Sequence, residues 1–131
     1  MDRAHDLASL ADNTAALNAA QIRGFALFTG KARCATCHAG FAFTDHGFYD
    51  IGLTGRDPGR GPILGVPAVN SAFKTPTLRE LVWTAPYMHD GSIATLEQVV
   101  RHYERGGERR PTRARELASR IELQADALRK P

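Results

Sequence analysis

The sequence has 131 residues, 43% of them hydrophobic and 24% charged, and a formal net charge of +3. This length and composition are typical of a single globular domain and exclude the disordered and collagen-like classes. No apolar run reaches the roughly 18 residues that span a bilayer, and so small a net charge does not indicate nucleic-acid binding.

The first predicted element is a helix over residues 15–29. Its apolar positions fall roughly on one helical face: Ile22, Phe25, Ala26 and Phe28. Asp12 or Asn13 is a candidate N-cap, and Gly30 follows the expected end. This helix leads the chain directly into its two cysteines.

The two cysteines and a histidine form the motif Cys34-Ala-Thr-Cys37-His38. At this spacing the thiols form thioethers with the two vinyl groups of a haem, while the adjacent imidazole binds the iron. A thioredoxin-like pair needs a βαβ context, which a preceding helix does not provide. A zinc site lacks a second cysteine pair, because the chain has two cysteines in total. We predict one covalently attached haem c with His38 as proximal ligand, and zinc or a plain disulfide as the alternatives.

No helical period runs from Phe41 to about Phe73, and the stretch TGRDPGRGPILGVPAVN is rich in Gly and Pro. An irregular segment of this length is unusual in a small domain unless it has a function. A large flat cofactor would supply the hydrophobic core that such a segment lacks. We therefore expect an ordered loop wrapped around the haem.

The last part of the chain contains the clearest helix signal. A short helix is expected over residues 77–82, and a turn-rich loop, TAPYMHDGS, follows it. Thr95 and Gln98 then form a capping box, and Gly106-Gly107 end the helix. Its apolar stripe is Leu96, Val99, Val100 and Tyr103. A final helix is expected after Thr112, with one apolar face: Ala114, Leu117, Ala118, Ile121, Ala125 and Leu128. The predicted fold is all-α and cytochrome c-like, with few helices and long loops around one haem.

Two residues compete as the sixth ligand of the iron. Met88 lies in a loop after Pro86, where small electron-transfer cytochromes often carry a thioether ligand, so spacing alone favours it. Tyr103 lies on the inward stripe of the capped helix, and a phenolate binds ferric haem iron. Core packing would also explain either residue. The histidines are weaker candidates: His102, at the edge of the stripe, and His5, His46 and His89.

Arginines cluster towards the end of the chain: Arg101, Arg105, Arg109, Arg110, Arg113 and Arg115. Glu104 and Glu108 are interspersed, so the pattern is more typical of a solvated face than of a docking site for an acidic redox partner.

Four strings in the sequence carry a family resemblance: GFALFTGKARCATCHAG, FTDHGFYDIGL, FKTPTLREL and TAPYMHDGSIATLEQVVRHYERGG. Over about residues 24–107 the chain resembles the C-terminal haem domain of bacterial di-haem cytochrome c peroxidases and their MauG-type relatives. The resemblance implies a haem that receives or stores electrons, while peroxide reacts at an N-terminal haem. It also implies a sixth ligand at Tyr103, because this family position holds Met in peroxidases and Tyr in MauG-like members. Met88 matches a position that is often aromatic.

The chain departs from that family in one respect, since full members have two CxxCH motifs and more than twice this length. We therefore expect an electron-transfer haem domain, with Arg79 of the PTLR string as a candidate partner for a haem propionate. A surface Arg79 is the alternative. The rival functions are a peroxidase or oxidase acting at this haem or within a split di-haem enzyme, and a sensor or assembly module that binds haem.

The expected partner is a redox protein, and a second haem-bearing chain or domain is one such partner. Self-association is a further expectation. Haem attachment to CxxCH normally takes place outside the cytoplasm, so the periplasm is the expected location. The first residues, MDRAHDLASLADN, do not read as a signal peptide. We accordingly expect a removed export signal or a piece of a longer precursor.

Overall fold

The computed structural model describes residues 17–117. Their backbone divides into two compact units. Unit 1 contains the described residues as far as Gly47 together with Thr75–Arg79, and unit 2 contains Phe48–Lys74 and the described residues from Glu80 onwards. The assignment of residues 1–131 to one domain stays a prediction. In the described part of the chain, no helix is long and apolar enough to cross a membrane.

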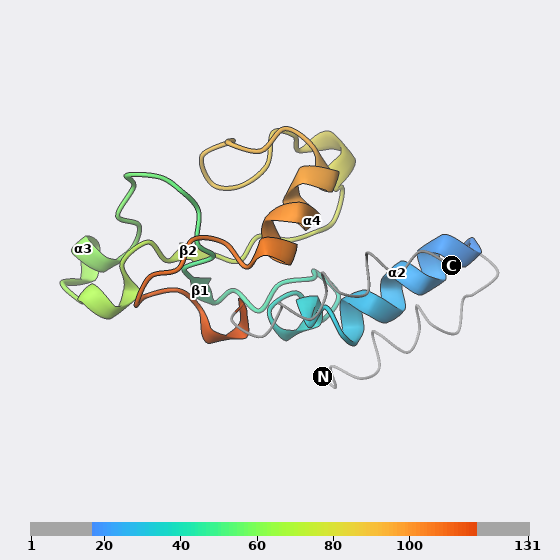
Figure 1. Ribbon diagram of the computed structural model, residues 1–131, viewed down its shortest axis with the longest axis horizontal. Helices are drawn as coiled ribbons and strands as arrows, with labels where there is room; N and C mark the ends of the chain where they lie inside the picture. Colours follow the sequence, from blue (N-terminus) through green and yellow to red (C-terminus); the bar gives the residue numbers. More distant parts are fainter. Residues whose placement is uncertain (1–16, 118–131) are drawn as a thin grey trace. The chain divides into compact units, whose positions relative to one another are not determined.

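Unit 1 begins with helix α2, Ala19–Thr29, drawn in blue in Figure 1. Asn18 caps it, since the Asn18 Oδ1 accepts from the Gln21 amide and the Gln21 Oε1 accepts from the Asn18 amide, both at 2.9 Å. This reciprocal capping box satisfies two of the amides that have no partner at a helix start. Gly30 closes the helix by donating to the Ala26 carbonyl at 3.0 Å.

The predicted start of this helix is wrong at residues 17 and 18, while residues 15 and 16 lie outside the described range. Residues 15–29 were expected to be helical with Asp12 or Asn13 as N-cap, whereas the helix begins at Ala19. The Asn18-x-x-Gln21 box sets this boundary, because the extended backbone of the cap residue interrupts the helical pattern. Asp12 and Asn13 lie outside the described residues.

Unit 2 contains a small antiparallel sheet, in which β1, Phe48–Tyr49, pairs with β2, Phe73–Lys74 (Figure 1). The chain between the strands forms helix α3, Gly61–Leu64, and a 3-10 helix, Pro67–Val69. The all-α prediction is therefore confirmed in part, as a helix-rich fold with one small sheet. Strands of two residues carry no detectable alternation, so the sequence pattern does not reveal them.

The short helix predicted over residues 77–82 is displaced. The structure forms a 3-10 helix at Leu81–Trp83, and the preceding Glu80 is left-handed with φ 59°. A left-handed residue does not continue a right-handed helix, so the helical turn begins only after Glu80.

Helix α4, Leu96–Arg105, confirms the strongest helix prediction. The Thr95 hydroxyl accepts from the Gln98 amide at 3.2 Å, and the Gln98 side chain accepts from the Thr95 amide at 3.3 Å. Gly106 ends the helix in the left-handed conformation, as expected for a C-terminal glycine. A 3-10 helix, Arg115–Leu117, occupies the start of the predicted final helix, whose remaining residues lie outside the described range.

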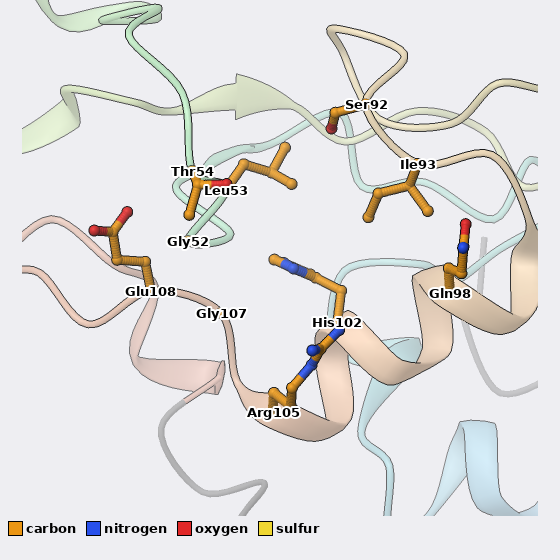
Figure 2. A pocket seen from close by; sticks show the side chains of 10 residues that line it. All are labelled: Gly52, Leu53, Thr54, Ser92, Ile93, Gln98, His102, Arg105, Gly107 and Glu108. Atoms are coloured by element: carbon orange, nitrogen blue, oxygen red, sulfur yellow. The ribbon is translucent and has the colours of Figure 1, made fainter.

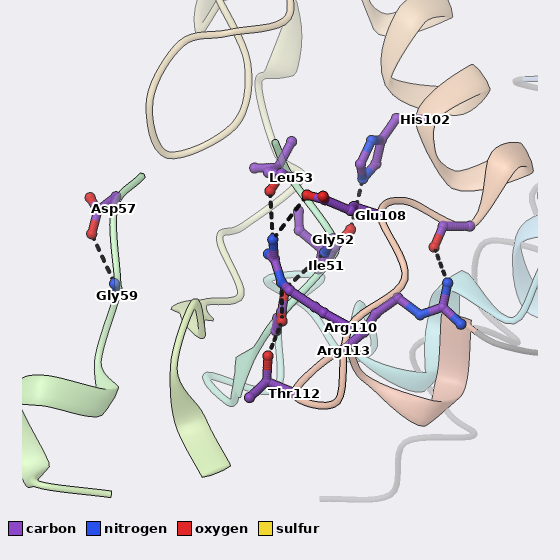
Figure 3. A network of polar contacts seen from close by, with 12 residues as sticks. Ile51, Gly52, Leu53, Asp57, Gly59, His102, Glu108, Arg110, Thr112 and Arg113 are labelled. Atoms are coloured by element: carbon purple, nitrogen blue, oxygen red, sulfur yellow. Dashed lines mark hydrogen bonds and ion pairs between the residues drawn. The ribbon is translucent and has the colours of Figure 1, made fainter. Parts of the chain in front are cut away.

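A buried carboxylate joins the segment after α4 to the segment after β1, and Figure 3 labels two of the side chains that bind it, Arg110 and Thr112. Asp50 is 2% exposed and accepts hydrogen bonds from the Arg110 Nε at 2.7 Å, the Thr112 hydroxyl at 2.6 Å and the Gly52 amide at 2.9 Å. Arg110 also donates to the Leu53 carbonyl at 3.0 Å. Burial alone would raise the pKa of Asp50, but these hydrogen bonds and the Arg110 charge outweigh it and hold the pKa below its ordinary value.

Two glycines allow the same two segments to touch. Gly52 and Gly107 have φ values of 69° and 65°, and a Cβ on Gly107 would lie 2.6 Å from the Ile51 carbonyl oxygen. The Glu108 amide donates to the Gly52 carbonyl at 2.8 Å across this contact. Larger residues do not fit here, so the glycines set how closely the segments pack.

The first prediction concerns this carboxylate. Asp50→Asn leaves Arg110 with a neutral partner, so we expect the free energy of unfolding at pH 7 to fall by about 3 kcal/mol. The ionised Asp50 stabilises the fold above the unfolded pKa of about 4, and this stability is lost as the pH falls towards the lower folded pKa. Denaturant unfolding between pH 7 and pH 3 measures both effects.

The matched control is Asp57→Asn. Asp57 also accepts a backbone amide, from Gly59 at 2.8 Å, but its side chain is 57% exposed. We expect a small effect at Asp57 and a flatter acid limb for Asp50→Asn than for the unmodified protein. Equal losses for both variants would contradict a specific role of Asp50.

Candidate functional site

The cysteine motif lies on a tight turn of unit 1. The 3-10 helix Cys34–Thr36 follows Arg33, and the His38 amide donates to the Cys34 carbonyl at 2.9 Å. The Cys37 carbonyl accepts from the Asp45 amide at 2.8 Å. Both cysteines are half-buried and are not joined in a disulfide. The turn therefore presents two thiols and an imidazole within five consecutive residues.

The His38 ring is oriented by a backbone carbonyl. Its Nδ1 lies 2.9 Å from the Phe43 oxygen, and a carbonyl oxygen only accepts hydrogen bonds. In the neutral ring the proton must then lie on Nδ1, so Nε2 is the ring nitrogen that carries the lone pair. A metal-ligating histidine typically has this arrangement, because the hydrogen bond fixes the tautomer and raises the basicity of the ligand.

The described residues leave large apolar side chains uncovered. None of the large side chains in residues 17–117 is fully buried, and the buried hydrophobic residues there are the small set Leu53, Ala72 and Leu117. Phe41 is 72% exposed and Trp83 is 81% exposed. With so little core among residues 17–117, this part of the chain is expected to pack around a cofactor or against a covering surface.

The residues present fit a covalently attached haem. The donor set is two thiols for thioethers and one imidazole oriented by a backbone carbonyl, and the exposed Phe41 ring of the same unit fits an apolar cofactor. Within residues 17–117 no group of three or more His, Cys, Asp or Glu side chains is placed to hold a metal ion, so the zinc alternative finds no ligand set there.

Arg79 belongs to unit 1 and contacts the loop that follows the motif. Its guanidinium lies 3.9 Å above the Phe41 ring centroid, and its Nε donates to the Phe41 carbonyl. Among residues 17–117 the terminal Nη groups have no hydrogen-bond partner. Arg79 is exposed, so both the surface reading and the propionate partner stay predictions, and its outer edge has the donor fork that matches a carboxylate.

The two predicted sixth ligands lie in unit 2. Tyr103 is half-buried on α4, with its ring edge-to-face against His102 at 5.3 Å. Met88 is half-buried in a turn, where its φ of 72° is uncommon for a residue with a side chain. Both assignments stay predictions.

The apolar stripe of α4 is less buried than the sequence indicates. Leu96 is 41% exposed and Val100 is 58% exposed, while Val99 and Tyr103 are half-buried. The helical spacing is correct, but the described residues do not cover the stripe. An uncovered stripe beside Tyr103 is what a helix facing a cofactor would present.

His102 occupies a different place from the predicted ligands. Its Nε2 lies 2.8 Å from the Ile51 carbonyl, so the ring braces α4 against the segment after β1. His102 also lines a hollow of about 520 Å³ together with Leu53, Ile93 and Gln98, whose side chains are drawn in Figure 2. This agrees with a supporting residue rather than an iron ligand.

The other histidines also have local roles. His89 stacks on Phe73 with ring centroids 3.4 Å apart, and His46 is exposed with a positive φ. His5 lies outside the described residues.

Within the arginine cluster, Arg110 and Arg113 have partners in unit 2 outside helix α4. Arg110 pairs with Asp50, and Arg113 donates to the Gly106 carbonyl at 2.9 Å. Arg101 is exposed and pairs with Glu97 one helical turn away, which is typical of a solvated face. Docking of an acidic partner at this cluster stays a prediction.

Sequence reasoning missed two groups that shape these sites. The Phe43 carbonyl is a backbone atom, so no residue type identifies it. Asp50 is an isolated acid in an irregular segment, and its partner Arg110 lies 60 residues away.

No family model matches the sequence. The methylamine utilization protein MauG of Methylorubrum extorquens is 53% identical over 105 residues, which cover 78% of this chain and 30% of that protein. The cytochrome-c peroxidase IdrP1 of Denitromonas iodatirespirans is 34% identical over 139 residues, which cover 82% of this chain and 37% of that protein.

A solved structure agrees with these relatives. The crystal structure of a MauG-like protein associated with microbial copper homeostasis superposes with a TM-score of 0.65 at 28% identity, covering 82% of this chain and 46% of that chain. The chain spans about a third of the length of the curated relatives it matches. Sequence and fold together place the chain in the family of MauG and the bacterial cytochrome c peroxidases.

Proposed function

We propose that this chain is a c-type haem electron-transfer domain, similar to the electron-storing half of a di-haem cytochrome c peroxidase or MauG-like enzyme. The observation that carries the proposal is the turn of Cys34, Cys37 and His38, with the His38 tautomer set by the Phe43 carbonyl. The cysteines would hold one haem through thioethers, and the His38 Nε2 would bind its iron. When bound, the haem supplies a one-electron couple between ferric and ferrous iron.

The protein groups around His38 would set the energy of that couple. The Nδ1 hydrogen bond gives the imidazole more electron density, which favours ferric iron and lowers the reduction potential. The exposed Phe41 ring, which lies in the same unit as His38, would help to exclude water from an apolar cofactor. Arg79 is the proposed partner of a haem propionate through its Nη edge, while its Nε holds the Phe41 carbonyl.

Tyr103 is the proposed sixth ligand, with Met88 as the alternative. Tyr103 projects from a doubly capped helix, so its position is set by a rigid element, whereas Met88 lies in a turn. An anionic phenolate stabilises ferric iron, and a thioether stabilises ferrous iron. The choice of ligand therefore decides whether the domain favours oxidised or reduced states.

A second haem-bearing domain or chain is the proposed redox partner. The chain spans about a third of its curated relatives and has a single CxxCH motif. Exposed apolar side chains such as Trp83 also need a covering surface, which a partner or a second copy would provide. The proposed location is the periplasm, where haem is attached to CxxCH motifs. A peroxidase acting at this haem itself is the competing function.

The second prediction is that the holoprotein carries one haem that resists extraction. Acid-acetone treatment should leave the colour on the protein, and the intact mass should include one haem. Cys37→Ala should retain one thioether with poorer maturation, while Thr36→Ala, a change inside the same turn, should behave as the unmodified protein. Loss of the haem on extraction, or stoichiometric zinc by metal analysis, would refute the central assignment.

The third prediction concerns the sixth ligand. Tyr103→Phe should abolish the six-coordinate ferric spectrum and raise the reduction potential, because a ferric-stabilising phenolate is lost. Met88→Leu should change neither. Tyr87→Phe is the matched control, since it removes a hydroxyl that donates to the Leu81 carbonyl at 2.9 Å. The opposite pattern, with Met88→Leu lowering the potential and Tyr103→Phe silent, would identify a His/Met carrier.

The fourth prediction is a low peroxidase turnover for the isolated chain. Six-coordinate iron leaves peroxide no vacant position, so steady-state assays with an electron donor should show little activity. The same assay on Tyr103→Phe should show more, because the sixth position opens. Fast turnover by a preparation with one haem per chain would favour the enzyme instead of the carrier.

A further inference from the structure

The carbonyl that orients His38 belongs to a residue in an unfavourable backbone conformation. Phe43 has a φ of 50°, in the left-handed region that aromatic residues rarely adopt. Its oxygen lies 2.9 Å from the His38 Nδ1. Such a conformation persists when neighbouring groups impose it, and it often marks a functional position. The contacts that impose it on Phe43 therefore also control the histidine.

The loop supplies part of this restraint by itself. The Phe43 amide donates to the Gly40 carbonyl at 3.0 Å, and the Thr44 amide donates to the Ala39 carbonyl at 3.1 Å. Gly40 has a φ of 73°, which only glycine adopts readily. The Phe28 ring of α2 meets the Phe43 ring edge-to-face, with centroids 6.2 Å apart.

The segment Thr75–Arg79 supplies the rest, although it lies more than thirty residues further along the chain. The Thr77 hydroxyl donates to the Ala42 carbonyl at 2.6 Å, which belongs to the peptide that enters Phe43. The Thr44 hydroxyl donates to the Thr75 carbonyl at 2.7 Å, on the other side of Phe43. This segment is therefore hydrogen-bonded to Ala42 and Thr44, the residues immediately before and after Phe43.

Arg79 completes the restraint. Its Nε donates to the Phe41 carbonyl, and its guanidinium lies 3.9 Å from the Phe41 ring centroid and 5.6 Å from the Phe43 ring centroid. One side chain thereby fixes a backbone oxygen and contacts both aromatic rings of the loop. A lysine keeps the charge but lacks this planar fork.

We propose that Thr77 and Arg79 are positioning residues for the axial imidazole of His38. They hold the backbone of residues 41 and 42, and this places the following carbonyl, that of Phe43, against the His38 Nδ1. They would thereby set the basicity of His38 and the reduction potential of the iron. The inference rests on the proposed haem function of His38. It differs from a charge effect of Arg79, because it assigns the same role to the uncharged Thr77.

The two roles of Arg79 predict opposite changes in the reduction potential when its side chain is replaced. Loss of the positioning contacts weakens the imidazole hydrogen bond, makes ferric iron less stable and raises the potential. Loss of a nearby positive charge destabilises ferrous iron and lowers the potential. A Lys substitution retains the charge, so a rise in Arg79→Lys reports positioning.

The test uses the full-chain holoprotein and two substitutions, Thr77→Val and Arg79→Lys. Spectroelectrochemical titration should show a higher midpoint potential for both variants. At a fixed applied potential the ferric-to-ferrous ratio should fall by up to tenfold, which corresponds to about 59 mV for a one-electron couple. Proton NMR of the haem-bound protein should show faster solvent exchange of the His38 Nδ1 proton. Thr77→Ser keeps the hydroxyl and should restore both values.

Two matched controls use the same chemistry elsewhere. Thr29→Val removes a hydroxyl that donates to the Phe25 carbonyl at 3.0 Å within α2. Arg60→Lys alters a guanidinium that lies 3.7 Å above the Phe48 ring in unit 2. Neither should move the potential or the exchange rate, because neither contacts the loop around Phe43.

The outcomes separate this inference from the function on which it rests. Covalent haem with unchanged potential and exchange in both variants would overturn the positioning role while leaving the haem function intact. A lower potential in Arg79→Lys would also overturn it. Absence of covalent haem in the unmodified protein would instead refute the function. If Thr77→Val yields no holoprotein, Arg79→Lys and its Arg60→Lys control provide the same readouts.

Discussion

The hydrogen bond between the His38 imidazole and the Phe43 carbonyl connects the cysteine motif to the rest of unit 1. The motif alone places an imidazole beside two thiols, but the ring needs a fixed tautomer before it becomes a defined ligand. Phe43 provides this by adopting a left-handed backbone, and the segment that ends in Arg79 holds it there. The chemistry of one side chain thus depends on a backbone atom and on residues distant in sequence.

The described residues achieve order with little hydrophobic core. Polar contacts take its place: capping boxes start α2 and α4, and the Asp50 carboxylate joins the segments after β1 and α4. Meanwhile Phe41 and Trp83 remain largely exposed. This division is expected when a chain supplies the walls of a site and another group fills it. Membership in the family of MauG and cytochrome c peroxidases agrees with that arrangement, and so does the limited share of those relatives that the chain spans.

Local sequence signals predicted much of the secondary structure near the site. The Thr95-x-x-Gln98 box and Gly106 define α4 within one residue, because capping depends on side chains three or four positions apart. The same rule applied to Asn18 and Gln21 would have placed the start of α2 correctly. The two-residue strands carried no comparable signal, because a pattern of period two needs more residues than they contain.

The sequence by itself determined the chemical groups of the candidate site: two thiols, Cys34 and Cys37, beside the imidazole of His38, at the spacing that predicts haem attachment. Tertiary structure decided what surrounds that set. The Phe43 carbonyl became the partner of His38, and Asp50 found Arg110 sixty residues away. Such pairings depend on how distant segments meet and on backbone atoms that every residue possesses. Spacing along the chain therefore carries information about ligands, whereas orientation and burial arise only when the chain folds.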